Sequence, residues 1–215
     1  QEPALWTPPA VEKRQLQAMV RRLDVLIEDR TRELNRFKSG QHPEIVADSI
    51  KAHLAFIDGQ VAQLEEQIHD HIDRHPGLKE DRALLTSIPG IGKRTAARLL
   101  GELPDLDAFD NANQLVAYAG LSPRQHHSGA SVHRATRLTY IGKRALRRTL
   151  YLPALVAQRH NPIIQAQRQR LLAKGKKKMV TVGAAMRKLL RLVYGVLKSR
   201  IPFDPYYAVN VQSPA

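Results

Sequence analysis

The sequence predicts an all-α protein in which a long antiparallel coiled-coil hairpin is followed by a compact helical domain. Three observations support this prediction. Apolar residues recur at three- and four-residue spacings over most of the chain, which is the period of a helix with one buried face. No stretch clearly alternates apolar and polar residues, as a half-buried strand does. Glycine and proline stand where one helix would end and the next begin.

Composition and charge restrict the partners of the protein. The 215 residues include no cysteine, which excludes disulfides and thiolate metal sites, and no apolar run is long enough to span a membrane. The formal net charge is +14, and between Asp110 and Asp204 there are 19 Lys and Arg but no Asp or Glu. Charge of one sign over that length repels itself unless a polyanion neutralises it. Nucleic acid is therefore the leading partner, and a merely basic, solvated surface is the alternative.

The first part of the chain predicts a linker over residues 1–10 and a coiled-coil hairpin arm over residues 11–76. The first helix is expected over about 11–38, with Gly40 and Pro43 marking its end and the restart of the chain. The seam of the second helix is spaced close to a heptad repeat, through Ile50, Leu54, Ile57, Val61, Leu64, Ile68 and Ile72. This seam favours a homo-oligomer through the coiled coil, and the alternative is a hairpin packed on its own globular domain. Three histidines lack a metal-ligand spacing and are expected on a solvated helix face: His69, His71 and His75.

A helical domain is predicted over residues 80–203, and it contains a helix-hairpin-helix motif at 83–101. In the turn Pro89-Gly90-Ile91-Gly92, glycines at 90 and 92 allow backbone N–H groups to approach a phosphate with no Cβ in the way. The next helix presents its positive dipole end there, which suits an anion. Three polar residues follow the turn: Lys93, Arg94 and Thr95. The alternative is a helix-turn-helix connection that binds no ligand.

The stretch from Gly120 to Ala154 combines a turn-rich loop with a basic helix and contains no carboxylate. The loop carries Ser122, Ser128, Ser131, His126, His127 and His133, and the helix carries Lys143, Arg144, Arg147 and Arg148. Together with Arg124, these helix cations can hold a phosphate and stabilise the charge that develops on it. A serine hydroxyl needs a base or a metal before it acts as a nucleophile, whereas a serine in a turn is usually a hydrogen-bonding cap.

The remaining elements follow from the same periodicity. The helix that begins near Gly142 is expected to bury four leucines: Leu146, Leu150, Leu152 and Leu155. A break at His160-Asn161-Pro162 precedes a helix over 162–173, a flexible basic link and a last amphipathic helix over about 180–199. Residues 204–215 are expected to form a tail without regular structure.

Four strings in this order resemble the C-terminal half of a known family of transposases: TSIPGIGKRTAARLLGEL, LVAYAGLSPRQHHSG, GKRALRRTLYLPA and AAMRKLLRLVYGVLKSRIPFDP. The family is insertion-sequence family one-ten, also called the one-ten/one-sixteen/nine-oh-two family, whose members are recombinases guided by a structured bridge RNA. The resemblance covers residues 83–205. It implies a DNA transposase with a serine nucleophile, which falls here on Ser128 in the step Ser128-Gly129.

The same resemblance implies that an N-terminal RuvC-like domain, with an Asp-Glu-Asp-Asp metal site for Mg²⁺, precedes the arm in the intact protein. This chain lacks such a part, so we expect a fragment that binds no cofactor or metal itself and is inactive alone. The family also implies DNA and a structured guide RNA as partners, no membrane, and a bacterial cytoplasmic, nucleoid-associated location.

Two interpretations remain open. One is the recombinase, in which Ser128 forms a covalent phosphoserine link to DNA, and the other is a non-catalytic helix-hairpin-helix module that binds DNA or RNA. Both interpretations use the same residues to bind nucleic acid: Gly90, Gly92, Lys93, Arg94, Thr95, Arg124, His126, His133, Lys143, Arg144, Arg147 and Arg148.

Overall fold

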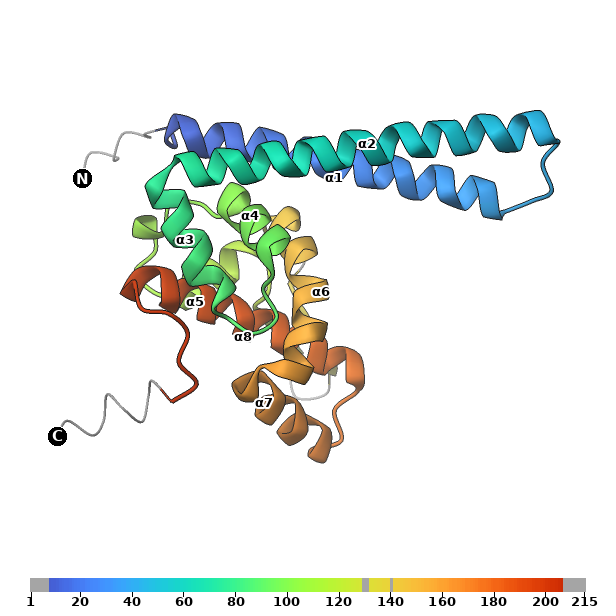
Figure 1. Cartoon of the computed structure of the whole chain (residues 1–215). Helices are drawn as coiled ribbons and strands as arrows, with labels where there is room; N and C mark the ends of the chain where they lie inside the picture. Colours follow the sequence, from blue (N-terminus) through green and yellow to red (C-terminus); the bar gives the residue numbers. More distant parts are fainter. Residues whose placement is uncertain (1–7, 129–131, 140, 207–215) are drawn as a thin grey trace. The chain divides into compact units, whose positions relative to one another are not determined.

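The computed structural model describes residues 8–128, 132–139 and 141–206, with the side chains of 124–128 and 132–137 outside the description (Figure 1). The elements are α1 (Val11–Lys38), α2 (Glu44–Arg74), α3 (Pro76–Thr86), α4 (Lys93–Glu102), the 3-10 helix η1 (Leu106–Ala108), α5 (Ala112–Tyr118), β1 (Pro123–Ser128), β2 (Val132–Leu138), α6 (Arg144–His160), α7 (Pro162–Ala173) and α8 (Lys178–Ser199). The predicted all-α class is confirmed, since helices form the buried cores. Within the described residues, no helix is both long enough and apolar enough to cross a membrane.

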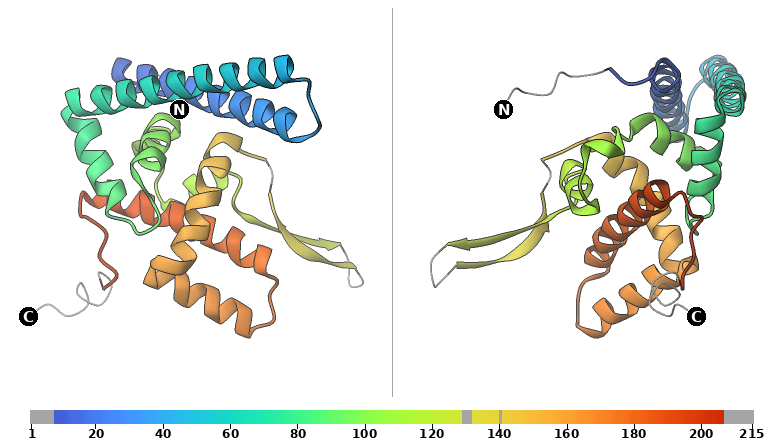
Figure 2. Two further views of the ribbon diagram at one scale, coloured as in Figure 1. Left: turned by 45° about the vertical axis from the view of Figure 1, so that its right-hand side comes forward. Right: turned by 90° about the vertical axis from the view of Figure 1, so that its left-hand side faces the viewer.

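A two-stranded antiparallel hairpin interrupts the helices, and the sequence analysis did not predict it. Strands β1 and β2 extend away from the neighbouring helices (Figure 2). Their register pairs Ser128 with Val132 and His127 with His133. The strand sequences PRQHHS and VHRATRL contain few apolar residues, so the alternation that reveals a half-buried strand is absent from them.

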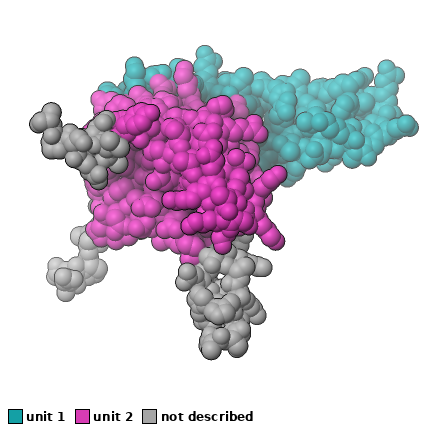
Figure 3. Space-filling model, turned by 90° about the horizontal axis from the view of Figure 1, so that it is seen from below, with its two compact units in different colours: residues 1–79 teal, residues 80–215 magenta. Residues whose placement is uncertain are grey.

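The chain divides into two compact units, which Figure 3 colours separately. Unit 1 covers Gln1–Lys79 and unit 2 covers Glu80–Ala215, so the division falls inside α3.

Unit 1 is built from the antiparallel pair α1 and α2. Apolar side chains buried along this pair are Leu16, Val20, Leu23, Leu26, Ile50, Ile57, Ile68 and Ile72. Four of the seven predicted seam residues are therefore fully buried, and the other three are half-buried: Leu54, Val61 and Leu64. The helices also share an ion pair between Arg30 and Asp58. The heptad spacing thus identified the buried face of α2.

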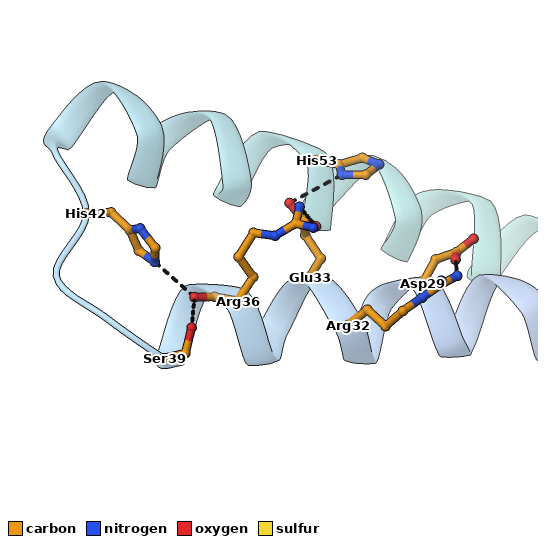
Figure 4. A network of polar contacts seen from close by, with 7 residues as sticks. All are labelled: Asp29, Arg32, Glu33, Arg36, Ser39, His42 and His53. Carbon is orange, nitrogen blue, oxygen red and sulfur yellow. Dashed lines mark hydrogen bonds and ion pairs between the residues drawn. The ribbon is translucent and has the colours of Figure 1, made fainter.

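Polar contacts organise the end of the arm where α1 turns into α2 (Figure 4). The Arg36 carbonyl oxygen accepts hydrogen bonds from Ser39 Oγ and from the His42 ring, both at 2.9 Å. The Arg36 guanidinium donates to Glu33 at 2.9 Å, and Glu33 also lies 3.6 Å from the ring of His53 on α2. The two bonds to Arg36 satisfy one of the last carbonyl groups of α1, which have no partner inside the helix.

The opposite end of the arm corrects one expectation. His71 is 7% exposed rather than solvated, and its Nε2–H donates to the Glu12 carbonyl oxygen at 2.8 Å. Its ring lies 4.4 Å from the ring of His75. The expectation failed because the start of α1 packs over this turn of α2 and supplies an acceptor that local spacing does not reveal.

Unit 2 has a helical core in which α8 lies against α5, α6 and α7. Its fully buried large side chains are Leu85, Ile88, Leu99, Leu115, Leu121, Leu146, Leu150, Ile164, Leu189 and Leu190. The expected burial of Leu146 and Leu150 is confirmed, but Leu152 is 67% exposed and Leu155 is half-buried. The prediction for Leu152 was wrong because two residues of helix turn through about 200°, which carries Leu152 to the side opposite Leu150.

Candidate nucleic-acid interface

The turn between α3 and α4 is held in the core of unit 2 by its isoleucines. Ile88 and Ile91 are buried, and the Ile91 N–H donates to the Ile88 carbonyl oxygen at 3.0 Å. Asn161 Nδ2 contacts the Pro89 carbonyl oxygen at 3.5 Å, while Asn161 Oδ1 caps the start of α7. The turn is therefore fixed against the junction of α6 and α7.

The two glycines of this turn have different surroundings. Gly90 has a φ of +107°, and a Cβ on it would lie 2.7 Å from Ala157 Cβ on α6. Gly90 is therefore required by backbone conformation and by close packing. Gly92 has a φ of −88°, is exposed, and would find nothing within 4 Å of an added Cβ. Of the two, only Gly92 is exposed and has open space where a Cβ would stand, which suits the approach of a phosphate.

Gly92 is also the N-cap of α4. Its carbonyl oxygen accepts the Ala96 N–H at 2.9 Å, and no side chain caps the helix start. The first turn carries no acidic residue, Lys93 and Arg94 are exposed, and Thr95 is half-buried. Uncapped N–H groups, the positive end of the helix dipole and two cations together favour an anion at this position.

The base of the β1–β2 hairpin is a close contact between two glycines. Gly120 and Gly142 have φ values of +69° and +138°, and a Cβ on Gly142 would lie 2.5 Å from the Gly120 nitrogen. The Thr139 N–H donates to the Ser122 carbonyl oxygen at 2.9 Å, and the Lys143 N–H donates to the Tyr118 carbonyl oxygen at 2.8 Å. These contacts hold together the two chain segments that lead into and out of the hairpin.

Two of the four predicted helix cations strengthen that base. Lys143 Nζ donates to the Glu102 carbonyl oxygen at 2.8 Å and lies 3.0 Å from Glu102 Oε2. The Lys143 and Glu102 side chains are 22% and 4% exposed. Arg147 Nη1 donates to the Ala119 carbonyl oxygen at 3.0 Å. Lys143 is therefore committed to a buried ion pair, whereas Arg144 and Arg148 are exposed near the start of α6.

Glu102 is a site residue that the sequence reasoning missed. Residues 120–154 contain no carboxylate of their own, whereas Glu102 reaches this segment from the end of α4. A signal was present in the sequence, because Glu102 is a lone carboxylate in the apolar string LLGEL. A buried acid almost always has a charged partner.

The predicted residues fall into two groups along α6 rather than one. The turn containing Gly90 docks at Ala157, whereas the basic residues lie at 143–148. Thirteen residues separate Ala157 from Arg144, which is about 20 Å along a helix axis. The backbones of Ser128, His126, His133 and Arg124 belong to the hairpin, and their side chains lie outside the described part of the structure. Among the described residues, no three His, Asp or Glu side chains group in a way that could hold a metal ion.

Comparisons with known proteins agree with the motifs. Residues 82–169 match the model of the protein family described as Transposase IS116/IS110/IS902 family. The chain is 33% identical over 213 residues to the pilin gene-inverting protein of Moraxella bovis, covering 95% of this chain and 63% of that protein. An uncharacterized 43.6 kDa protein of insertion element IS110 from Streptomyces coelicolor is 32% identical over 172 residues, which is 80% of this chain and 41% of that protein. The transposase of insertion sequence element IS1111A from Coxiella burnetii is 27% identical over 146 residues, which is 55% of this chain and 40% of that protein.

Proposed function

We propose that this chain is part of a DNA transposase or recombinase that moves or inverts a DNA segment. The observation that carries the proposal is the family match at 82–169, which includes the α4 N-terminus, the hairpin and all of α6. The names of two relatives, a pilin gene-inverting protein and a transposase, describe rearrangement of DNA. Because the chain spans 63% of the length of the first of them, the activity is assigned to the whole protein.

In this proposal, Ser128 is the nucleophile. Its Oγ attacks the phosphorus of a DNA phosphodiester, and the new phosphoserine bond replaces the bond to the leaving deoxyribose oxygen, which takes up a proton. The hydroxyl proton of Ser128 passes to a base. Because the phosphoserine keeps the energy of the phosphodiester, the strand can later be joined to another strand without an external energy source. A structured guide RNA selects the DNA, as the family resemblance implies.

The fixed base of the hairpin supports a role for the hairpin in positioning Ser128. The contact between Gly120 and Gly142 and the bonds of Lys143 and Arg147 fix where the hairpin leaves the helical core. Exposed Arg144 and Arg148 stand beside this base and are suited to hold phosphate oxygens. The Mg²⁺ that activates the attacking group is proposed to be held by an acidic RuvC-like domain of the whole protein.

The α4 N-terminus is proposed to hold a second phosphate about 20 Å further along α6. Contacts of this kind position a duplex without reading its sequence. Separating phosphate contacts from the reacting centre lets binding energy orient the strand for attack.

The experiment uses the whole protein with its guide RNA, Mg²⁺ and a DNA substrate. We expect Ser128→Ala to abolish strand exchange while DNA affinity stays within about threefold, because one hydroxyl is lost from the machinery and no charge is removed. Ser122→Ala is the matched control and should retain activity. Full strand exchange by Ser128→Ala would leave the non-catalytic binding module as the interpretation of this domain.

A further inference from the structure

The middle of α8 and the end of α7 carry cations that no part of the proposed function has used. Lys188 and Arg191 are three residues apart on α8 and so share a face of that helix. Arg170 lies on α7, which packs against α8. We call these three residues the α7–α8 basic patch.

The charges of the patch act on one another. Partial burial lowers the pKa of the Lys188 ammonium, and the positive charges of Arg191 and Arg170 lower it further. Like charges are thus held together around a half-buried amine, an arrangement that an anion would relieve. Residues 111–203 contain no Asp or Glu, so the surrounding sequence has no acid to supply the compensating charge.

Other cations on the same helix and just beyond it are neutralised. Lys198 pairs with Asp107 at 2.6 Å, and Arg200 pairs with Glu80 at 2.8 Å. By contrast, none of the three patch residues forms an ion pair with a residue in the described ranges. The cations at the C-terminal end of α8 therefore form ion pairs within the fold, whereas those in its middle are available to an external partner.

Two of the three patch residues, Lys188 and Arg191, lie on the helix that contacts the hairpin. A Cβ on Gly183 of α8 would lie 3.1 Å from Leu138 Cδ1, so the last residue of β2 rests on this helix. Lys188 and Arg191 follow Gly183 by five and eight residues, about 8 and 12 Å along the helix axis. Two patch residues therefore lie within about 12 Å, measured along the helix axis, of the position where β2 contacts α8.

We propose that Arg170, Lys188 and Arg191 form a binding site for the phosphate backbone of duplex DNA, separate from the α4 N-terminus. The proposal rests on the proposed DNA function. Duplex is favoured over single strands because α7 has no aromatic residue and α8 has only Tyr194, whose hydroxyl donates to the Phe109 carbonyl oxygen at 2.9 Å. A site for single strands usually adds aromatic faces on which bases stack. The site holds DNA in place without reading its sequence.

The first test measures the affinity of this chain for a duplex DNA of about 30 base pairs at several salt concentrations. Each lost phosphate contact lowers the slope of log affinity against log salt by about 0.9. We expect the triple variant Arg170→Gln, Lys188→Gln, Arg191→Gln to lose about two to three from that slope and at least about tenfold in affinity at moderate salt. The single variant Arg191→Gln should lose about one from the slope.

The matched control is Lys198→Gln, which removes the same charge from the same helix at a position already neutralised by Asp107. Its slope should stay close to that of the unaltered chain, and a loss equal to that of Arg191→Gln would overturn the proposal by showing only a net-charge effect.

An unchanged slope in the triple variant, with DNA still bound, would overturn the patch but not the proposed function. If the unaltered chain does not bind duplex DNA, both fail. If the substitutions weaken only a duplex RNA of the same sequence, the assignment to DNA is wrong.

A second measurement needs no substitution. Lys188 should be acylated readily by an amine reagent in the free chain, and duplex DNA should reduce its labelling several-fold, as measured by mass spectrometry. Lys51, on α2, is the internal reference and should change little. Labelling of Lys188 that is unaffected by saturating DNA would overturn the proposal even if a variant misfolds.

Discussion

Gly90 and Gly92 are two residues apart in one turn, yet their roles differ. Gly90 adopts a conformation that disfavours a side chain, and it also packs against Ala157. Gly92 has open space around it and stands before an uncapped helix. The sequence predicted a shared purpose because both glycines suit a phosphate-binding turn. Only the position of α6 distinguishes Gly90, which packs against Ala157, from Gly92, which has open space around it.

Replacing Gly92 with Val should therefore weaken DNA binding without unfolding the chain. A branched side chain obstructs the approach of a phosphate to the backbone, and its cost to stability should stay below about 1 kcal/mol. Binding titrations and circular dichroism would measure the two effects. Gly40→Val, another glycine with open space around it, should leave binding unchanged. Gly90→Ala should destabilise unit 2 by about 2–4 kcal/mol, through strain and overpacking. Unchanged affinity in a folded Gly92→Val variant would reduce the turn to a structural connection.

The pair formed by Glu102 and Lys143 leads to a stability prediction. Lys143→Met would leave a buried carboxylate without its partner and should cost about 3–5 kcal/mol in the free energy of unfolding, measured with urea. Arg144→Met, one residue further along and exposed, should change that free energy by less than about 0.5 kcal/mol. Equal effects of the two substitutions would mean that the ion pair does not hold the base of the hairpin.

At the scale of elements, the helices were predictable and the hairpin was not. Periodic apolar residues identified the two helices of the arm and the last helix, and His160-Asn161-Pro162 marked the break between α6 and α7. The strand sequences at 123–128 and 132–138 contain few apolar residues, so no local period marks them. The pairing of Glu102 with Lys143 spans 41 residues and depends on how α4 packs on α6. Such contacts between distant elements are what sequence periodicity leaves open.

The arm carries apolar surface that its own two helices do not cover. Ile45 is 81% exposed and Phe56 is 64% exposed, both on α2. Because the coiled-coil seam of α2 is already used against α1, we propose that a second copy of the arm covers these residues. The chain should then be at least dimeric by sedimentation, and Phe56→Glu should shift it toward monomer with its helix content retained.

Gln63→Glu provides the control for the Phe56→Glu experiment, since it places a glutamate at another exposed position of α2. It should leave the sedimentation coefficient unchanged. A clean monomer for the unaltered chain at high concentration would exclude pairing through the arm.

At the scale of the whole molecule, charge separation predicts a steep salt dependence. Nineteen basic and no acidic residues lie between Asp110 and Asp204. If about six phosphates are neutralised, affinity for nucleic acid should fall about a thousandfold between about 50 and 200 mM salt. Fluorescence anisotropy at several salt concentrations would measure this dependence. A nearly constant affinity would contradict a phosphate-binding surface and favour a merely basic, solvated one.

The central claim is that Ser128 becomes bonded to DNA, and the most direct measurement is to map the covalent adduct. The whole protein, its guide RNA, Mg²⁺ and a labelled substrate would be quenched during reaction, digested and analysed by mass spectrometry. The account predicts one phosphoserine-linked peptide containing Ser128 and no adduct in Ser128→Ala, while this chain alone forms none with any added metal. An adduct that persists in Ser128→Ala, or that maps to Ser122, Ser131 or Tyr140, would contradict the account.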